Sequence, residues 1–232
     1  MKPLLITICN DKWAYGHLIR WYRYARERSG CRLGLILISD DAKLEEALRI
    51  KFDKVVKFSV EHDMREFYNS VRLDACNLFD EDAVIYCDCD ADIWEDISGV
   101  VDNSPLVISC VESPAKHDAW KAVAKNPDGP EYNNGFLVIK DRNGCVLDAY
   151  MREFEKLKDA PDRIKGTIAF NKMLEVIEFT ALDKLYSVIW WDHMRVKEGK
   201  VIQWCNDKGQ EWRMNLEELW MRSFGVQKST IL

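Results

Sequence analysis

The chain has 232 residues, of which 47% are hydrophobic and 31% are charged, and it carries a net charge of -6 with a pI near 5.4. A hydrophobic fraction of this size can fill a continuous core, which excludes disorder as the dominant state. The negative charge argues against a nucleic-acid partner, because such a partner normally requires a basic face.

The amino terminus and the cysteines favour the cytoplasm. The first apolar run, residues 4–9, is too short for a signal peptide and is followed by no cleavage site. No stretch reaches the roughly 18–20 apolar residues of a membrane span. The eight cysteines form no CxxC pair and no Cys/His cluster with zinc spacing. We therefore expect them to be small buried side chains in a reducing compartment.

Short apolar runs alternate with amphipathic stretches through the first ninety residues. In chain order, this pattern predicts a strand at residues 4–9, a helix at 15–29, a strand at 32–38, a helix from residue 42, a strand at 55–58, a helix at 64–79 and a strand at 83–87. Strands that alternate with helices in this way predict an α/β fold, with a mostly parallel central sheet flanked by helices.

The second half is less regular. Strands are predicted at residues 106–109 and 136–139, helices at 145–157 and 168–174, and a late strand at 201–205. No internal repeat, low-complexity tract or linker interrupts the chain. A single domain over residues 1–232 is therefore expected.

Polar groups follow two of the predicted strands, namely Asn10 after the first and the run Asp88-Cys89-Asp90 after the fourth. Ligands of such sheets sit at the carboxyl ends of the strands, so these groups are candidates for one site. Carboxylates are hard oxygen ligands that suit Mg²⁺ or Mn²⁺. If the chain stays extended, Asp88 and Asp90 point to the same side. The alternative is that Asp88, Asp90 and Asp92 are ordinary turn and cap residues.

Two other metal motifs do not fit this acidic run. An EF-hand loop starting at Asp88 would need Gly at its sixth position and Glu at its twelfth, where this chain has Ile93 and Gly99. A phosphatase of the aspartyl-phosphate type usually carries its DxD after the first strand, with Thr or Val two residues beyond the second Asp. Here the motif follows the fourth predicted strand and Asp92 takes that position.

Four segments, in a fixed order, resemble the glycogenin and galactinol-synthase group of retaining GT-A glycosyltransferases. Residues 10–18 resemble the family's opening N-D-x-Y-A-x-G-A-L, and Arg72 lies sixteen residues before Asp88, where the family has a basic residue. Residues 86–90, with Asp-Ile at 96–97, resemble the family's strand, DxD motif and later Asp-Ile. Residues 132–139 resemble its F-N-S/A-G-V-x-V-I strand.

This resemblance implies a GT-A nucleotide-diphospho-sugar transferase fold. It also implies transfer of a hexose, with retention, from a UDP-glucose or UDP-galactose donor in the presence of Mn²⁺ or Mg²⁺. Residues 1–100 would form the nucleotide- and metal-binding half and residues 101–232 the sugar and acceptor half. Asp88 and Asp90 would bind the metal, and the residues implied in donor binding are Thr7, Cys9, Asn10, Trp13, Arg72, Cys89, Asn133, Asn134, Gly135 and Lys208.

The second half departs from the family pattern at two places. The family has an Asp-Gln pair before a Leu-Asn, whereas here Gly166 and Thr167 precede Phe170-Asn171. The family's late metal-binding His is replaced by Gln203, which we predict as the third ligand, with His193 as the alternative. No catalytic residue can be assigned from the sequence.

Two other functions remain open. A non-catalytic nucleotide-sugar-binding protein would explain the missing Asp-Gln pair and His. A nucleotidyltransferase on a similar fold would usually open with a Gly-rich, basic phosphate loop, and residues 9–13 contain none. A glycosyltransferase acting on DNA bases is disfavoured by the negative charge. The sequence does not identify the acceptor, for which a glycan, a protein and a small molecule are all open, nor the oligomeric state.

Overall fold

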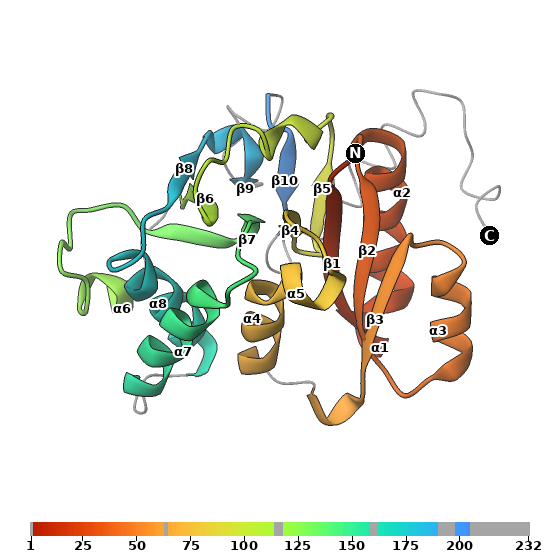
Figure 1. Ribbon diagram of the computed structural model, residues 1–232, viewed down its shortest axis with the longest axis horizontal. Coiled ribbons are helices and arrows are strands. Elements are labelled where there is room, and N and C mark those ends of the chain that lie inside the picture. Colours follow the sequence, from red (N-terminus) through yellow and green to blue (C-terminus); the bar gives the residue numbers. More distant parts are fainter. Residues whose placement is uncertain (1, 63–64, 114–117, 158–161, 190–197, 205–232) are drawn as a thin grey trace.

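The computed structural model describes residues 2–62, 65–113, 118–157, 162–189 and 198–204 (Figure 1). Within these residues a seven-stranded sheet has the order β3-β2-β1-β4-β7-β6-β8. Its strands are β1 (Leu4–Asn10), β2 (Arg32–Ile38), β3 (Lys54–Phe58), β4 (Val84–Cys87), β6 (Ile108–Glu112), β7 (Tyr132–Ile139) and β8 (Thr180–Leu182). A second sheet has the order β5-β10-β9, with β5 (Ala91–Ile93), β10 (Val201–Gln203) and β9 (Val188–Ile189).

Most of the large sheet is parallel. β1 pairs in parallel with β2 and β4, and β2 does so with β3. β7 runs antiparallel to both β4 and β6, and β6 is parallel to β8. The predicted α/β fold with a mostly parallel sheet is confirmed. Because β1 to β4 all run the same way, their carboxyl ends share one edge of the sheet.

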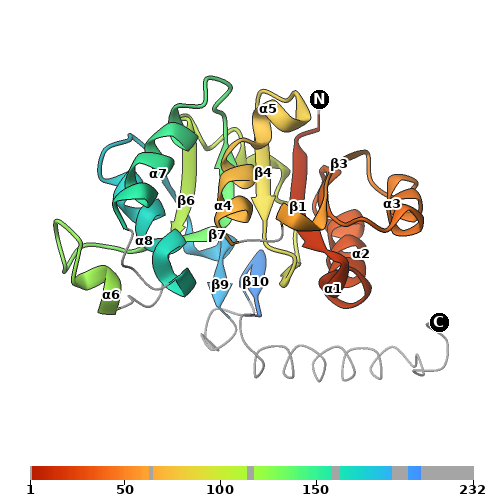
Figure 2. The ribbon, with the colours of Figure 1, turned by 90° about the horizontal axis from the view of Figure 1, so that it is seen from below.

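Helices cover both faces of the sheet (Figure 2). They are α1 (Asp11–Trp13), α2 (Ile19–Arg28), α3 (Ala42–Arg49), α4 (Arg65–Leu73), α5 (Ala75–Phe79), α6 (Asp118–Lys121), α7 (Cys145–Lys156) and α8 (Asp162–Leu174). In β1, Leu4, Ile6 and Ile8 pack in one core with side chains of α4, α5, α7 and α8, while Leu5 and Cys9 pack in the other core with side chains of α2 and α3. Of these described helices, none is apolar and long enough to cross a membrane.

Some predicted elements have different bounds. The helix predicted at 64–79 is two helices, α4 and α5, separated at Asp74. β7 begins at Tyr132, four residues earlier than predicted, because its ladder with β6 continues past a bulge to the pair Glu112–Tyr132. Asn171 of α8 binds the backbone of Tyr132 as well. Its Oδ1 accepts from the Tyr132 N–H at 2.6 Å, and its Nδ2 donates to the Tyr132 carbonyl at 2.9 Å. The late strand at 201–205 is β10, which belongs to the second sheet.

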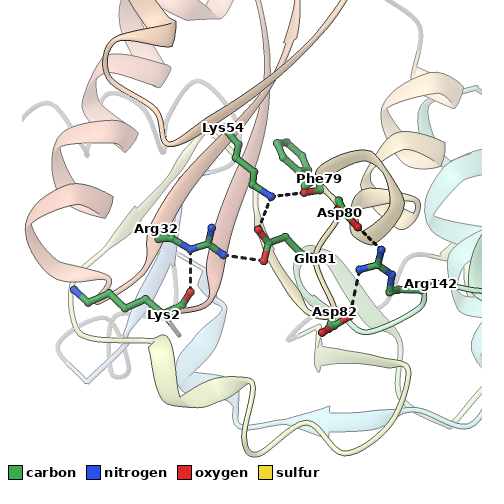
Figure 3. A network of polar contacts seen from close by, with 8 residues as sticks. All are labelled: Lys2, Arg32, Lys54, Phe79, Asp80, Glu81, Asp82 and Arg142. Carbon is green, nitrogen blue, oxygen red and sulfur yellow. Dashed lines mark hydrogen bonds and ion pairs between the residues drawn. The ribbon is translucent and has the colours of Figure 1, made fainter.

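A network of charged residues joins the amino-terminal ends of the parallel strands (Figure 3). Glu81, just before β4, accepts from Arg32 at the start of β2 at 2.8 Å. The other oxygen of Glu81 lies 2.6 Å from Nζ of Lys54, at the start of β3. Burial raises the pKa of Glu81, but the hydrogen bonds from Arg32 and Lys54 outweigh burial, so the net pKa is lowered. This network holds the sheet together at the edge opposite to Asn10 and the acidic run.

Candidate functional site

A cleft of about 380 Å³ opens at the carboxyl ends of β1 and β4. These strands are parallel neighbours, with Ile6 opposite Tyr86, so Asn10 and the turn after Cys87 come to the same edge. Residues of β1, α1, α4, β4, β7 and α8 contribute to the lining. The lining includes eight of the residues that the sequence predicts as donor-binding or metal-binding, namely Cys9, Asn10, Trp13, Arg72, Asp88, Cys89, Asp90 and Asn134.

The acidic run forms a tight turn and is not extended. The Asp88 N–H donates to the Gly135 carbonyl at 2.9 Å, and the Ala91 N–H donates back to the Asp88 carbonyl at 3.1 Å. The turn brings the side chains of both Asp88 and Asp90 to the cleft. Asp92 lies on β5 and is only 1% exposed, with a carboxylate oxygen 3.5 Å from Nε of Arg20. Two of the three carboxylates therefore face the cleft, and the third is part of the core.

Arg72 supplies a fixed positive charge next to Asp88. Its guanidinium donates to the Asn134 backbone carbonyl at 2.8 Å and lies 4.7 Å from the centre of the Tyr86 ring. The same nitrogen is 3.8 Å from Oδ1 of Asp88, to which the Tyr86 hydroxyl also donates. Burial raises the pKa of Tyr86 well above its usual value, so this hydroxyl stays protonated as a donor. The contacts hold Arg72 in one orientation, as an anion-binding group needs.

Gly135 makes room for the groups behind the acidic turn. A Cβ at this position would lie 2.5 Å from Asp88 Oδ2, 2.5 Å from Gln203 Nε2 and 3.0 Å from Asn133 Oδ1. These three side chains therefore crowd around the Gly135 backbone, and any larger residue would displace them.

The hydrogen bonds fix which way the Gln203 amide faces. The Gly135 N–H donates to Asn133 Oδ1 at 2.6 Å, so Asn133 must turn its Nδ2 toward Gln203. Nδ2 then donates to Gln203 Oε1 at 2.8 Å. The Gln203 Nε2 group is left on the Asp88 side, where it is buried without a hydrogen-bond partner among the described residues. Gln203 thus presents an N–H donor toward Asp88, and its oxygen already accepts a hydrogen bond from Asn133.

Asn10 and Trp13 form the rim of the cleft. Oδ1 of Asn10 accepts from the Trp13 N–H at 3.2 Å and so caps the short helix α1. The cap holds Trp13 at the cleft, where its side chain is 37% exposed. Its ring centre is 4.3 Å from that of His17. A large aromatic surface is therefore open to a ligand.

Cys9 and Cys89 bring two thiols together in the lining of the cleft. The hydrogen bond to Cys9 is the main reason that the pKa of Cys89 is raised well above its usual value, and burial adds to it. Both cysteines are free. Cys89 is thus a neutral thiol at ordinary pH, and neither charges nor acidifies the site.

The structure also shows residues that the sequence did not nominate as ligand-binding. Tyr68, Asn69 and Tyr86 line the cleft, as do Gly166 and Thr167, which mark the departure from the family pattern. Asn69 could have been found from its spacing, because it lies one helical turn before Arg72.

Other nominated residues lie elsewhere. Thr7 is fully buried in β1 and does not line the cleft. Asn133, Gly135 and Gln203 lie behind the acidic turn, where the Gly135 carbonyl accepts from the Asp88 N–H. Lys208 and the alternative ligand His193 are outside the described residues, so the structure does not test them.

The donor set fits a hard divalent cation in part. Asp88 and Asp90 both line the cleft, and Mg²⁺ is commonly held by one or two carboxylates together with substrate phosphates and water. Gln203 would have to turn its amide over, and so lose the hydrogen bond from Asn133, to offer its oxygen. Within the described residues no group of three His, Cys, Asp or Glu side chains is arranged for a metal. The two aspartates are therefore the metal-binding candidates.

Comparison with known proteins adds information on the fold. No protein-family model matches the sequence, and no curated protein sequence matches it. Among solved structures, the galactosyltransferase LgtC in complex with donor and acceptor sugar analogues has a TM-score of 0.64, covering 88% of this chain and 87% of its own, at 10% identity. The chain has the GT-A fold. The fold predicted from the sequence is thereby confirmed, while the closer resemblance to the glycogenin group stays a prediction.

Two further solved structures have the same fold. The apo-form glycosyltransferase GlyE of Streptococcus pneumoniae TIGR4 has a TM-score of 0.64 at 12% identity, covering 89% of this chain and 55% of its own. The bifunctional glycosyltransferase WbbM in its apo form has a TM-score of 0.60 at 15% identity, covering 89% of this chain and 46% of its own. The chain thus spans about half the length of these two proteins.

Proposed function

We propose that this protein is a glycosyltransferase that binds a nucleotide-sugar donor in the cleft and transfers its sugar to an acceptor. The observation that carries the proposal is the combination, in one cleft, of an exposed aromatic ring, a fixed guanidinium and a pair of carboxylates, contributed by Trp13, Arg72, Asp88 and Asp90. A base, a diphosphate and a divalent cation require these three chemistries. The GT-A fold supports the proposal.

In this proposal the chain's own residues bind and orient the donor. Trp13 stacks on the base through a π-face that tolerates any base. Arg72 donates to the diphosphate, whose negative charge increases as the glycosidic bond breaks. Asp88 and Asp90 would hold Mn²⁺ or Mg²⁺, which when bound neutralises that charge and orients the phosphates.

The finer features of the reaction are proposed from the resemblance. They are a UDP donor, glucose or galactose as the transferred sugar, and retention of configuration. Among the described residues that line the cleft, the only carboxylates are Asp88 and Asp90. Because both are assigned as ligands of the cation, the proposal includes no carboxylate nucleophile. The acceptor would instead be deprotonated by a group of the donor itself.

A thermal-shift and hydrolysis experiment tests the proposal. We expect UDP-glucose or UDP-galactose to raise the Tm more with Mn²⁺ than with EDTA, because a ligand that binds only the native state stabilises it. Release of UDP should then depend on Mn²⁺ and be lost in Arg72→Ala. If neither UDP nor any UDP-sugar shifts the Tm under either condition, the UDP donor is refuted, and if no nucleotide-sugar of any base shifts it, the proposal is wrong.

A second candidate function is nucleotide-sugar binding without transfer. It is favoured by Gly166 and Thr167, which line the cleft in place of the family's Asp-Gln pair. This function predicts the same Tm shifts with UDP-sugars, but no release of UDP with or without an acceptor.

A further inference from the structure

One end of the cleft is formed by α4 and α8, away from Trp13. Tyr68 and Asn69 of α4 line this end together with Gly166 and Thr167 of α8, the two helices are in contact there, and Asn134 of β7 is a neighbour of Asn69. Asn69 is only 9% exposed and yet lines the cleft. A nearly buried polar side chain is normally hydrogen-bonded, and the Asn69 oxygen has its partner in Asn134.

Gly166 is the reason that Asn69 can occupy its position. A Cβ on residue 166 would lie 2.2 Å from Nδ2 of Asn69 and 3.1 Å from its Cγ. A separation of 2.2 Å is far below van der Waals contact, so even alanine would require Asn69 to move. The Asn69 amide therefore takes up the space that a side chain of α8 would otherwise fill.

The neighbouring amide orients Asn69. Nδ2 of Asn134 donates to Oδ1 of Asn69 at 3.5 Å, so the Asn69 oxygen faces β7 and its nitrogen faces α8. The Asn134 backbone carbonyl in turn accepts from Arg72, which lies three residues after Asn69 on α4. Because residues three apart share one face of a helix, Asn69 and Arg72 line the same wall of the cleft. A group bound by Asn69 would thus be next to the group bound by Arg72.

We propose that Asn69 is a sugar-recognising residue, that it donates its amide N–H groups to a hydroxyl of the donor's sugar, and that Gly166 is required because it makes room for this amide. The inference rests on the proposed function, in which Arg72 binds the diphosphate and the sugar follows it along the same wall. An amide is suited to a hydroxyl because it offers both donors and an acceptor at fixed angles. A site built to bond a hydroxyl discriminates strongly against ligands that lack it.

Comparing two ligands tests the inference. The dissociation constants of UDP and of UDP-galactose or UDP-glucose, whichever the wild type binds more tightly, are measured by calorimetry with Mn²⁺. Asn69→Ala should weaken the UDP-sugar about tenfold, which is typical of one lost hydrogen bond to a ligand, and leave UDP within about twofold. Gly166→Ala should give the same pattern, because its Cβ displaces Asn69.

Two further variants separate this role from a structural one. The double variant Asn69→Ala/Gly166→Ala should bind the UDP-sugar as the single Asn69→Ala variant does, since the clash is gone and the amide was already lost. It should also be at least as stable as that single variant, because alanine is a better helix former than glycine. Gly99→Ala is the matched control, since a Cβ there would meet nothing within 4 Å, and it should change neither ligand's affinity.

The outcomes are distinguishable. If Asn69→Ala weakens UDP and the UDP-sugar equally, or leaves both unchanged in a folded protein, the inference is overturned and the proposed function stands. If wild-type protein binds neither ligand, the proposed function fails, and the inference fails with it. If Gly166→Ala does not fold, the double variant still decides, because restored folding in it confirms the clash with Asn69 and loss of folding in both refutes it.

Discussion

Asp90 and Asp92 have the same charge and are two residues apart in the chain, but the structure places them in different surroundings. Asp90 lines the cleft, whereas Asp92 is 1% exposed and pairs with Arg20. Replacing each by asparagine removes one negative charge and almost no volume. We expect Asp90→Asn to abolish donor cleavage in a stable protein, and Asp92→Asn to destabilise a protein that is still active while folded.

The magnitudes follow from burial. Arg20 has a side chain only 14% exposed, and removing one partner of a buried ion pair leaves a charge uncompensated. Asp92→Asn should therefore lower the free energy of unfolding by about 3 kcal/mol. Asp90 is only half-buried and on a turn, so its replacement should change stability by less than about 1 kcal/mol. Its loss as a metal ligand should reduce donor cleavage about a hundredfold or more, because even groups that only support a ligand often cost 10–100-fold.

Two measurements on the same samples check this pair. Urea unfolding followed by tryptophan fluorescence gives the free energy of unfolding, and UDP release from a UDP-sugar with saturating Mn²⁺ gives the activity per folded molecule. Calorimetry with Mn²⁺ should show weakened binding in Asp90→Asn alone. The reasoning would be refuted by an Asp90→Asn variant with full activity, or by an Asp92→Asn variant that is inactive and as stable as the wild type.

Three other predictions concern single positions. Trp13→Ala should weaken UDP binding by about 1–3 kcal/mol, and Trp13→Tyr should keep most of it, because an aromatic face is retained; unchanged calorimetric affinity in Trp13→Ala would rule out stacking. Gln203→Glu keeps an oxygen for its Asn133 partner and places a second oxygen on the Asp88 side, so it should tighten Mn²⁺ binding about tenfold; weaker binding would show that the N–H group of Gln203 is what the site uses. Glu81→Gln should cost about 1–2 kcal/mol of stability at pH 7 through its bonds to Arg32 and Lys54. Because the folded-state pKa of Glu81 is lowered, this difference should be present above its ordinary value of 4.5 and vanish as the pH falls through the lowered pKa, which urea unfolding from pH 7 to 3 would measure; a difference independent of pH would contradict it.

The sequence by itself determined three neighbouring strands of the large sheet, β2, β1 and β4. The runs at residues 4–9, 32–38 and 83–87 are apolar on both faces, and only a parallel strand covered by helices on each side buries them in that way. The same pattern fixed the edge at which Asn10 and the acidic run meet, because parallel strands end together. Local spacing was sufficient here, since the apolar run of each strand by itself shows that both of its faces are buried.

Only the tertiary structure decided which polar groups face the cleft. A hydrogen bond from the Asp88 N–H to the Gly135 carbonyl stands at the start of the turn, after which Asp90 lines the cleft and Asp92 is buried. Gly135 is 47 positions away from Asp88 in the chain. The orientation of the Gln203 amide depends on Asn133, and the position of Asn69 depends on the missing Cβ of Gly166. These contacts join segments that are far apart in sequence, and each depends on how closely those segments approach one another. No periodicity or motif in one segment carries that information, because the partner that decides the geometry lies in another.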